Sequence, residues 1–584
     1  MNSAPLWVQG DRTVLVEVDH ESADPVQRFL PRFAELEKSP ERFHTYRITP
    51  LSLWNAAAIG VSADEIIEFL TRWSRHAPPA NVLHDIRDFL GRYGLLRLVR
   101  RDGTGLVIES KDAGLLKDLH QSGVLSRLVR GVDGDGALSV DEAVRGDVKV
   151  ALLKLGYPVE DLAGYAPGAA YPFRLRAAAG GGDFVLRHYQ QRAAELFHLG
   201  GGERGGSGVI VLPCGAGKTI VAMAVMEKVQ AATLILTTNT VAVHQWRAEL
   251  LDKSETPAED IGEYTGMRKE IRPITVSTYQ IMTHRRSRME PAFTHFGLFS
   301  ARDWGLIIYD EVHLLPAPVF RATAELQARR RLGLTATLVR EDQHEDDVFS
   351  LIGPKRFDMP WKELESQGWI ATARCIEVRV PMPPELRLPY LSLPPRDQFR
   401  VASENPQKLE VLRRILDRHR GSHVLVIGQY LGQLEEISRQ LGAPLITGKT
   451  PVGEREVLYA DFRAGRIPVL VVSKVGNFAI DLPDANVAIQ VSGTFGSRQE
   501  EAQRLGRILR PKKGGMPADF YSLITRDSKE VEYGEKRQRY LTERGYSYRI
   551  IGPPDVSVPE GRGFPPKDPA SHANTDDPST RPVS

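Results

Sequence analysis

The sequence has only two cysteines, no basic-then-apolar segment at its N-terminus and no long apolar run. Cys214 and Cys375 lie far apart, and Cys214 falls within a glycine-rich loop, so neither a disulfide nor a zinc site is expected. Without a run of about eighteen apolar residues, no segment is predicted to span a membrane. These absences favour a protein of the reducing cytosol with no membrane partner.

The chain also lacks a strong net charge, because 76 Lys and Arg face 74 Asp and Glu. This balance neither demands nor excludes nucleic acid as a partner, and any basic surface must be local. The 584 residues are 42% hydrophobic and 26% charged, which indicates a globular protein of about three or four domains.

One glycine of the common phosphate-binding pattern is missing, since Leu212 stands where GxxxxGK[ST] begins with glycine. Even so, LPCGAGKT (212–219) follows an apolar run and precedes a helical pattern, the context that a phosphate loop needs. Its glycines let backbone N–H groups approach phosphate, Lys218 can reach the β/γ-phosphates, and Thr219 can hold Mg2+. The alternative is a plain glycine-rich turn. The predicted nucleotide-binding set is Pro213, Cys214, Gly215, Ala216, Gly217, Lys218 and Thr219.

A second apolar strand, 306–309, ends in Asp310-Glu311-Val312-His313. A carboxylate at a strand's carboxyl end is suited to Mg2+, and a neighbouring carboxylate can orient an attacking water. We therefore predict an NTPase that uses ATP and Mg2+, with Lys218, Asp310 and Glu311 as catalytic residues and with Thr219 and Asp310 as metal ligands. Upstream, the amide of Gln190 is a candidate for reading adenine.

The apolar runs predict two units built on parallel sheets, because helical patterns separate the strands. The first unit has predicted strands at 209–212, 234–237, 274–278, 306–309 and 331–335, and the second at 424–427, 469–472, 487–491 and 520–524. Breaks at AAAGGGD (177–183) and at the proline-rich 381–395 divide the chain further. The predicted domains are 1–110, 111–182, 183–375, a linker at 376–404, 405–550 and a disordered tail at 551–584.

The N-terminal region carries three predicted helices followed by a hairpin, at residues 48–110. Thr49-Pro50 and the Ser62–Glu65 capping box begin the first two helices, and the hairpin turns at Asp102-Gly103. This order is typical of a winged helix. Such a module could contact DNA or serve for protein interaction and packing. The candidates for DNA contact are Arg87, Arg92, Arg97, Arg100 and Arg101.

The second unit has no phosphate loop but carries QRLGRILR at 503–510. Arg507 and Arg510 are three residues apart and share one helix face, with Gln503 on much the same face. Two guanidinium groups aimed at a neighbouring unit's γ-phosphate would supply the positive charge that phosphoryl transfer requires. The alternative is a solvated basic helix face.

Six motifs stand in order along the chain: LRHYQ, GAGKT, DEVH, TAT, SKVGNFAIDLP and QRLGRILR. This set resembles the superfamily 2 helicases and, more narrowly, the XPB family in its bacterial form. The narrower resemblance depends on four features: DEVH in place of DEAD or DEAH, Arg340-Glu341-Asp342 directly after TATLV, the spacing of QRLGRILRPK (503–512), and the region that precedes the motor.

The resemblance implies an α/β fold with two RecA-like motor domains behind an α+β N-terminal region that contains a winged-helix-like module. It implies a damage-recognition-like role for 111–182 and a reduced thumb at the proline-rich 376–404. It further implies an ATP-dependent 3′→5′ DNA helicase or double-strand translocase of the nucleotide-excision-repair type. Duplex or forked DNA would be bound without sequence preference, a repair nuclease would be a partner, and the location would be cytoplasmic and nucleoid-associated.

The resemblance also links Arg340, Glu341 and Asp342 to unwinding. Hydroxyl and amide groups at strand ends are suited to DNA phosphates, although each alone could be an ordinary strand-end cap. These candidates are Thr238, Ser277, Thr278, Gln280 and Ser473.

Two other classes stay open. One is a different superfamily 2 motor, such as a chromatin-remodeller-like translocase, a restriction-enzyme motor subunit or an RNA helicase. The other is a non-motor binding protein with a degenerate ATPase core, which the presence of all the catalytic residues disfavours.

Overall fold

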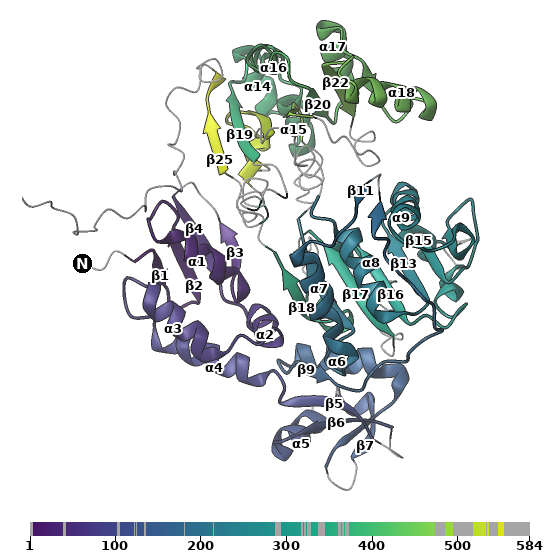
Figure 1. Cartoon of the computed structure of the whole chain (residues 1–584). Helices are drawn as coiled ribbons and strands as arrows, with labels where there is room; N and C mark the ends of the chain where they lie inside the picture. The colour runs from purple at the N-terminus through teal and green to yellow at the C-terminus, as the bar shows by residue number, and fades with distance from the viewer. Residues whose placement is uncertain are drawn as a thin grey trace, which may run out of the picture.

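The computed structural model shows two α/β lobes together with smaller N-terminal units (Figure 1). It describes residues 4–38, 42–101, 105–121, 123, 125–132, 136–179, 182–213, 215–285, 294–316, 319, 323, 329–336, 345–359, 364, 367, 369, 373–473, 485–493, 518–532, 534–535 and 547–553. Within these ranges, no helix is both long enough and apolar enough to cross a membrane.

The first N-terminal unit is an antiparallel sheet of order β1-β2-β4-β3 that packs with helices. Its elements are β1 (Leu6–Val8), β2 (Thr13–Glu17), α1 (Ala23–Phe29), β3 (Glu35–Lys38), β4 (Phe43–Arg47), α2 (Pro50–Ala58), α3 (Ala63–Trp73) and α4 (Ala80–Arg92). The three predicted helices are confirmed as α2, α3 and α4, and Thr49 and Ser62 cap the first two. Their buried faces, with Leu53, Ile66 and Ile86, join the sheet in one core.

The predicted hairpin also forms, but it belongs to a different sheet from the three helices. β5 (Leu96–Arg101) and β6 (Gly105–Ser110) pair inside a five-stranded sheet of order β7-β8-β6-β5-β9. The other elements of this second unit are β7 (Val129–Val132), β8 (Leu138–Val140), β9 (Val159–Asp161), α5 (Ala113–Gln121) and α6 (Arg145–Lys154). The winged-helix interpretation is therefore not confirmed, because strand pairing carries the hairpin across the boundary predicted at residue 110.

Four of the five arginines proposed for DNA contact in this region form ion pairs within the chain. The pairs are Arg92–Asp88 at 2.6 Å, Arg97–Glu160 at 3.6 Å, Arg100–Glu142 at 2.8 Å and Arg101–Glu109 at 2.9 Å. Arg87 is exposed on α4. Because most of these partners are partly exposed, each pair contributes little to stability.

The first lobe is a parallel sheet of order β14-β15-β13-β16-β17-β12-β18. Its strands are β12 (Ser207–Val211), β13 (Thr233–Thr237), β14 (Ile261–Tyr264), β15 (Ile274–Thr278), β16 (Leu306–Asp310), β17 (Arg330–Thr335) and β18 (Lys355–Asp358). The helices include α7 (His188–His198), α8 (Lys218–Val229), α9 (Thr240–Lys253), α10 (Tyr279–Met282) and α12 (Glu345–Leu351). All five predicted strands are confirmed, while β14 and β18 at the two edges were not predicted.

The second lobe is a parallel sheet of order β21-β22-β20-β23-β24-β19-β25. Its strands are β19 (Ala373–Val380), β20 (Val424–Gly428), β21 (Leu445–Ile446), β22 (Val469–Ser473), β23 (Val487–Gln490), β24 (Ala518–Thr525) and β25 (Ser547–Ile551). Its helices include α14 (Pro384–Leu391), α15 (Pro395–Ser403), α16 (Gln407–Arg418), α17 (Leu431–Leu441) and α18 (Val452–Arg463). The segment 376–404, predicted as a linker or reduced thumb, thus contains most of β19 and two short helices.

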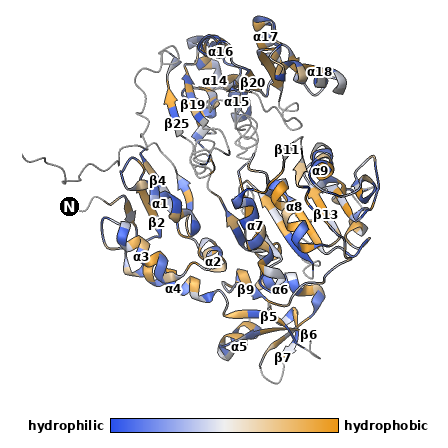
Figure 2. Cartoon of the chain, in the orientation of Figure 1, coloured by the Kyte–Doolittle hydropathy of each residue, from blue (hydrophilic) through white to orange (hydrophobic). Residues whose placement is uncertain are grey.

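The two lobes repeat one topology. In each, the first strand along the chain takes the sixth place in the sheet, the second takes the third place, and the later strands follow in the same pattern. Apolar strands lie inside and more polar helix faces lie outside (Figure 2). The predicted fold class, two RecA-like parallel-sheet domains behind an N-terminal region, is confirmed apart from the winged helix.

The end of the N-terminal region lies along the first lobe. Ala169 N–H donates to the carbonyl of Asp303 at 2.7 Å, and Arg176 N–H donates to the carbonyl of Lys253 at 2.9 Å. A small apolar cluster of Trp54, Leu153 and Phe349 joins both N-terminal units to α12. Residues 169–176 therefore pack as part of the first lobe, although the sequence placed that domain's start at 183.

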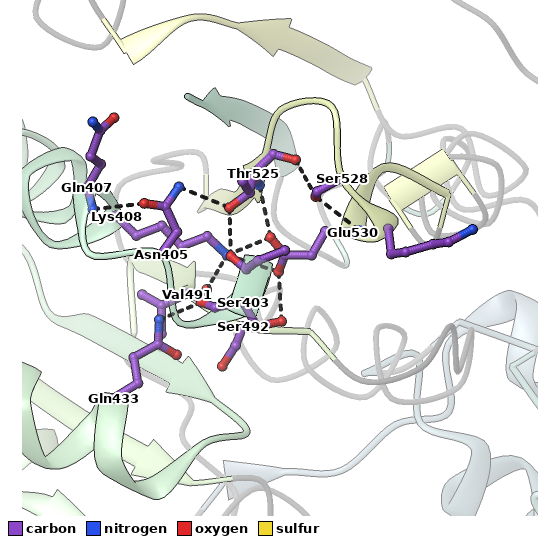
Figure 3. Close-up of polar contacts among 12 residues, drawn as sticks. Ser403, Asn405, Gln407, Lys408, Gln433, Val491, Ser492, Thr525, Ser528 and Glu530 are labelled. Atoms are coloured by element: carbon purple, nitrogen blue, oxygen red, sulfur yellow. Dashed lines mark hydrogen bonds and ion pairs between the residues drawn. The ribbon is translucent and has the colours of Figure 1, made fainter. Parts of the chain in front are cut away.

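A buried ion pair joins several elements of the second lobe (Figure 3). The Lys408 ammonium donates to both carboxylate oxygens of Glu530, at 2.9 and 2.8 Å, and to the carbonyl of Val491 at 3.0 Å. Ser403 Oγ and Thr525 N–H donate to the same carboxylate. The pair thus connects α16 to the ends of β23 and β24, and each charge has a full set of partners.

Replacing Lys408 by methionine should lower the melting temperature of the full chain, because Glu530 would stay buried without its cation. The expected cost is about 3–5 kcal/mol. Arg420→Ala is the matched control, since the Arg420–Asp417 pair leaves its side chains 82% and 65% exposed and contributes less than about 1 kcal/mol. Equal melting temperatures for the two variants, measured by differential scanning fluorimetry, would contradict this account.

Candidate active site

The phosphate loop connects β12 to α8 at the carboxyl edge of the first sheet. Gly215 and Gly217 have φ of +80° and +78°, a region that glycine enters without strain. A Cβ at Gly217 would lie 2.6 Å from Gln190 Nε2, so any side chain there would displace the Gln190 amide as well as strain the backbone. Because α8 begins at Lys218, its free N–H groups face the loop and favour a bound anion.

Lys218 and the DEVH carboxylates meet at this edge. Lys218 Nζ lies 3.3 Å from Glu311 Oε1 and 3.5 Å from the carbonyl of Leu212. Burial alone would raise the pKa of Glu311, but the charges of Lys218 and His313 outweigh it and lower that pKa. The lowered pKa favours the ionised form of Glu311 beside the predicted phosphate site, the form that its predicted role needs.

Glu311 also has an unusual backbone, with φ of +52° in the left-handed region. Residues other than glycine seldom adopt this conformation, and it often marks a functional site. Just after it, His313 Nδ1 lies 2.6 Å from Thr335 Oγ1 at the end of β17. The turn after β16 is thus held to the neighbouring strand, and it aims Glu311 toward Lys218.

Asp310 receives hydrogen bonds from two aromatic side chains. Trp246 Nε1 on α9 donates to Asp310 Oδ2 at 2.8 Å, and Tyr279 Oη on α10 donates to the Asp310 carbonyl at 2.9 Å. Burial and the charge of Glu311 raise the pKa of Asp310. Burial and the negative charge of Glu311 both disfavour ionised Asp310. A divalent cation bound there would offset both effects, because it favours the ionised carboxylate.

These residues fit a nucleoside triphosphate with Mg2+. The glycine cradle, the helix N-terminus and Lys218 suit phosphate, and the oxygens of Thr219 and Asp310 suit a hard cation. The described part of the chain contains no group of three or more His, Cys, Asp or Glu that could hold a metal. Two protein ligands completed by phosphates and water are the usual arrangement for Mg2+.

Gln190 lies beside the loop, but its amide already has partners. Its Oε1 accepts from Arg187 N–H at 3.0 Å, and its Nε2 donates to the Ala216 carbonyl at 3.3 Å. Tyr189 Oη donates to the same carbonyl at 2.7 Å. In this structure Gln190 supports the phosphate loop, and its contact with adenine stays a prediction.

Four of the DNA candidates gather at the carboxyl ends of β13 and β15. Ser277 Oγ donates to the Tyr264 carbonyl at 2.8 Å, and Thr278 Oγ1 accepts from Ile281 N–H at 3.3 Å as a helix cap. Gln280 is exposed, and its amide donates to the carbonyl of Thr238. These hydrogen bonds are the ones expected of ordinary caps, and contact of Ser277 and Thr278 with DNA stays a prediction.

The fifth DNA candidate lies in the second lobe, and several motif residues lie outside the described ranges. Ser473 is buried at the end of β22, where its hydroxyl has no hydrogen-bond partner among the described residues. Cys375 is buried in β19. Cys214, the Arg340-Glu341-Asp342 motif, Gln503, Arg507 and Arg510 lie outside the described residues.

Sequence reasoning missed Trp246 and Tyr279, and it assigned no role to His313 or Thr335 individually. Trp246 stands in the middle of a helical pattern, where an aromatic residue usually indicates core packing. Tyr279 sits between two residues already chosen for DNA contact. A buried indole or phenol needs a hydrogen-bond partner, and only the fold shows that Asp310 is that partner.

Two parallel-sheet lobes, with a phosphate loop and a carboxylate pair on the first, are the arrangement of a helicase motor, and the family models agree with it. Residues 364–559 match the model of the ERCC3/RAD25/XPB C-terminal helicase. Residues 183–340 match that of the type III restriction enzyme res subunit, and residues 6–130 match that of a helicase conserved C-terminal domain.

The chain belongs to the XPB helicase family. It is 53% identical over 96% of its length to the DNA 3'-5' helicase XPB of Mycobacterium tuberculosis, which it covers completely at 100%. It is 51% identical over 97% of its length to the protein of the same name from Kineococcus radiotolerans, again covering 100%. A third relative, the general transcription and DNA repair factor IIH helicase/translocase subunit XPB of Encephalitozoon cuniculi, is 34% identical over 96% of this chain and 84% of that protein.

Lys218→Ala should reduce ATP hydrolysis at least about hundredfold, because the lost ammonium stabilises charge on the transferred phosphoryl group. The melting temperature should stay close to that of the wild type. Lys228→Ala, at an exposed position later in the same helix, is the matched control and should hydrolyse ATP normally. A phosphate-release assay that finds Lys218→Ala within tenfold of wild type would contradict the assignment of the loop.

Proposed function

We propose that this chain is an ATP-driven DNA motor, a 3′→5′ helicase or double-strand translocase that acts in DNA repair of the nucleotide-excision type. The observation that carries the proposal is the contact of Lys218 with Glu311 across the phosphate loop, in a member of the XPB family. A degenerate, non-motor core would have no reason to keep this pair desolvated, since burying charges is costly unless they serve a function.

The residues of the first lobe divide the work of hydrolysis. Lys218 and the N-terminus of α8 would bind the β- and γ-phosphates, and Thr219 and Asp310 would hold Mg2+. The metal, when bound, supplies charge that neutralises the leaving phosphate. Glu311 would accept a hydrogen bond from the attacking water and hold it in line. His313, which contacts Thr335 at the next strand end, would keep the Glu311 turn in place.

The second lobe would complete the site. Arg507 and Arg510, with Gln503, would add positive charge to the transition state from across the lobe boundary. ATP binding would then draw the lobes together and hydrolysis would release them. Arg340, Glu341 and Asp342 would serve unwinding, and a repair nuclease would be the partner. These roles come from the motif order in the sequence and from the family.

DNA would lie along the carboxyl ends of β13 and β15, held through its phosphates and so without sequence preference. The exposed amide of Gln280 beside Thr238 supports this placement. The N-terminal units would recognise damaged or forked DNA. A nucleoid-associated location in the cytoplasm follows from such a substrate.

ATPase assays with different nucleic acids would test the class of motor. Duplex or forked DNA should stimulate hydrolysis more than RNA of the same length and charge. Strand separation of a forked DNA with a 3′ tail should require ATP. Equal stimulation by RNA would favour an RNA helicase instead and would contradict the proposal.

Glu311→Gln should leave ATP binding within about threefold of wild type but slow turnover at least about hundredfold, since the water would lose its carboxylate partner while Asp310 keeps the metal. Glu195→Gln, on the partly exposed face of α7, is the control and should turn over normally. Fluorescent-nucleotide binding and single-turnover hydrolysis measure the two effects separately. Unchanged turnover would remove Glu311 from its proposed role.

A further inference from the structure

Two buried aromatic side chains hold the carboxylate that would bind the metal. Trp246 is 2% exposed and donates its indole N–H to Asp310 Oδ2, while Tyr279 is 3% exposed and donates its hydroxyl to the Asp310 carbonyl. One bond therefore orients the side chain and the other fixes the backbone. Neither residue belongs to the phosphate loop or to DEVH.

Each aromatic residue comes from a segment that begins at the proposed DNA edge. Trp246 lies on α9, which starts directly after Thr238 and Asn239, with the Asn239 side chain as its N-cap. Tyr279 is the first residue of α10, which Thr278 caps. Gln280, next to Tyr279, donates to the Thr238 carbonyl, so the two segments are also bonded to each other.

The strands below these segments make the connection stiff. β13 and β15 pair in register up to their last residues, Thr237 and Thr278, and Thr237 Oγ1 donates to the Ser277 carbonyl at 3.2 Å. Thr237 and Ser277 are fully buried, and close-packed protein interiors transmit strain. A shift of either segment start would move an aromatic donor relative to Asp310.

We propose that Trp246 and Tyr279 are positioning residues, which hold Asp310 through one hydrogen bond each and make its placement depend on the two segments at the DNA edge. The inference rests on the proposed function, since it takes DNA to be what those segments contact. DNA that moves the start of α9 or α10 would then change the position of Asp310, through contacts that lie entirely within the first lobe.

The conservative variants Tyr279→Phe and Trp246→Phe remove each donor while keeping an aromatic ring. Tyr309→Phe and Trp304→Phe are the matched controls in the same lobe. Tyr309 points to the opposite face of β16 from Asp310, and its hydroxyl contacts Thr323. The Trp304 indole donates to the Leu298 carbonyl at 3.0 Å. The controls lose comparable buried bonds that do not reach Asp310.

The measurements are the Mg2+ concentration that half-saturates binding of a fluorescent ATP analogue, the ratio of DNA-stimulated to basal ATPase kcat, and the melting temperature. Trp246→Phe should raise the Mg2+ requirement about tenfold and Tyr279→Phe about threefold, because a bond to a charged carboxylate outweighs one to a carbonyl. The stimulation ratio should fall at least about threefold in both variants. Both controls should keep the wild-type Mg2+ requirement and ratio.

The outcomes separate the inference from the proposed function. A wild-type enzyme that DNA does not stimulate would refute the proposed function, while the Mg2+ titration would still test the hold on Asp310. A stimulated wild type, with both variants equal to their controls in Mg2+ requirement and ratio, overturns the inference alone. A raised Mg2+ requirement with an unchanged ratio overturns the link to the DNA edge. If the variants differ from their controls only in a lower melting temperature, Trp246 and Tyr279 have a packing role, and the inference is overturned.

Discussion

The first lobe depends on one geometric constraint, the parallel direction of all seven strands in its sheet. Parallel strands place all their carboxyl ends at one edge, so Lys218, Trp246 and Asp310 converge there although they are far apart in sequence. Desolvating an ammonium and two carboxylates is unfavourable on its own. The buried strands, with side chains such as Leu234 and Ile308, supply the stability that keeps these polar groups together.

Much of this arrangement could be predicted from the sequence because the signals are local. A continuous apolar run marks a strand buried on both faces, and the polar residue after it marks the carboxyl end. The phosphate loop combines a strand, two glycines and a helix start within a dozen residues. For the same reason the sequence predicts Lys218, Asp310 and Glu311 as neighbours at this edge of the sheet, and Lys218 and Glu311 lie 3.3 Å apart.

What escaped prediction depends on partners distant in sequence. Two strand-like runs around Asp102-Gly103 predicted the hairpin of β5 and β6 but not the sheet it would join, because β8 and β9 lie downstream and are short. β19 was mistaken for the end of one unit and a linker, although its register with β24 places it inside the second sheet. Trp246 was not singled out, because its hydrogen-bond partner Asp310 lies 64 residues away in the sequence. Pairing and side-chain direction are tertiary properties that no local pattern encodes.

The segment that lies along the first lobe has a consequence for biosynthesis. Its backbone partners, among them Gln230, Lys253 and Asp303, are all translated after it. When 169–176 leaves the ribosome, its hydrogen-bonding groups have only water as a partner until the strands of the lobe follow. The N-terminal units can fold first, as domains generally do during synthesis, but their junction with the motor closes only when translation has passed Phe349 on α12. Residues 169–176 therefore reach their final conformation only after the first lobe, which follows them in the chain, has been translated.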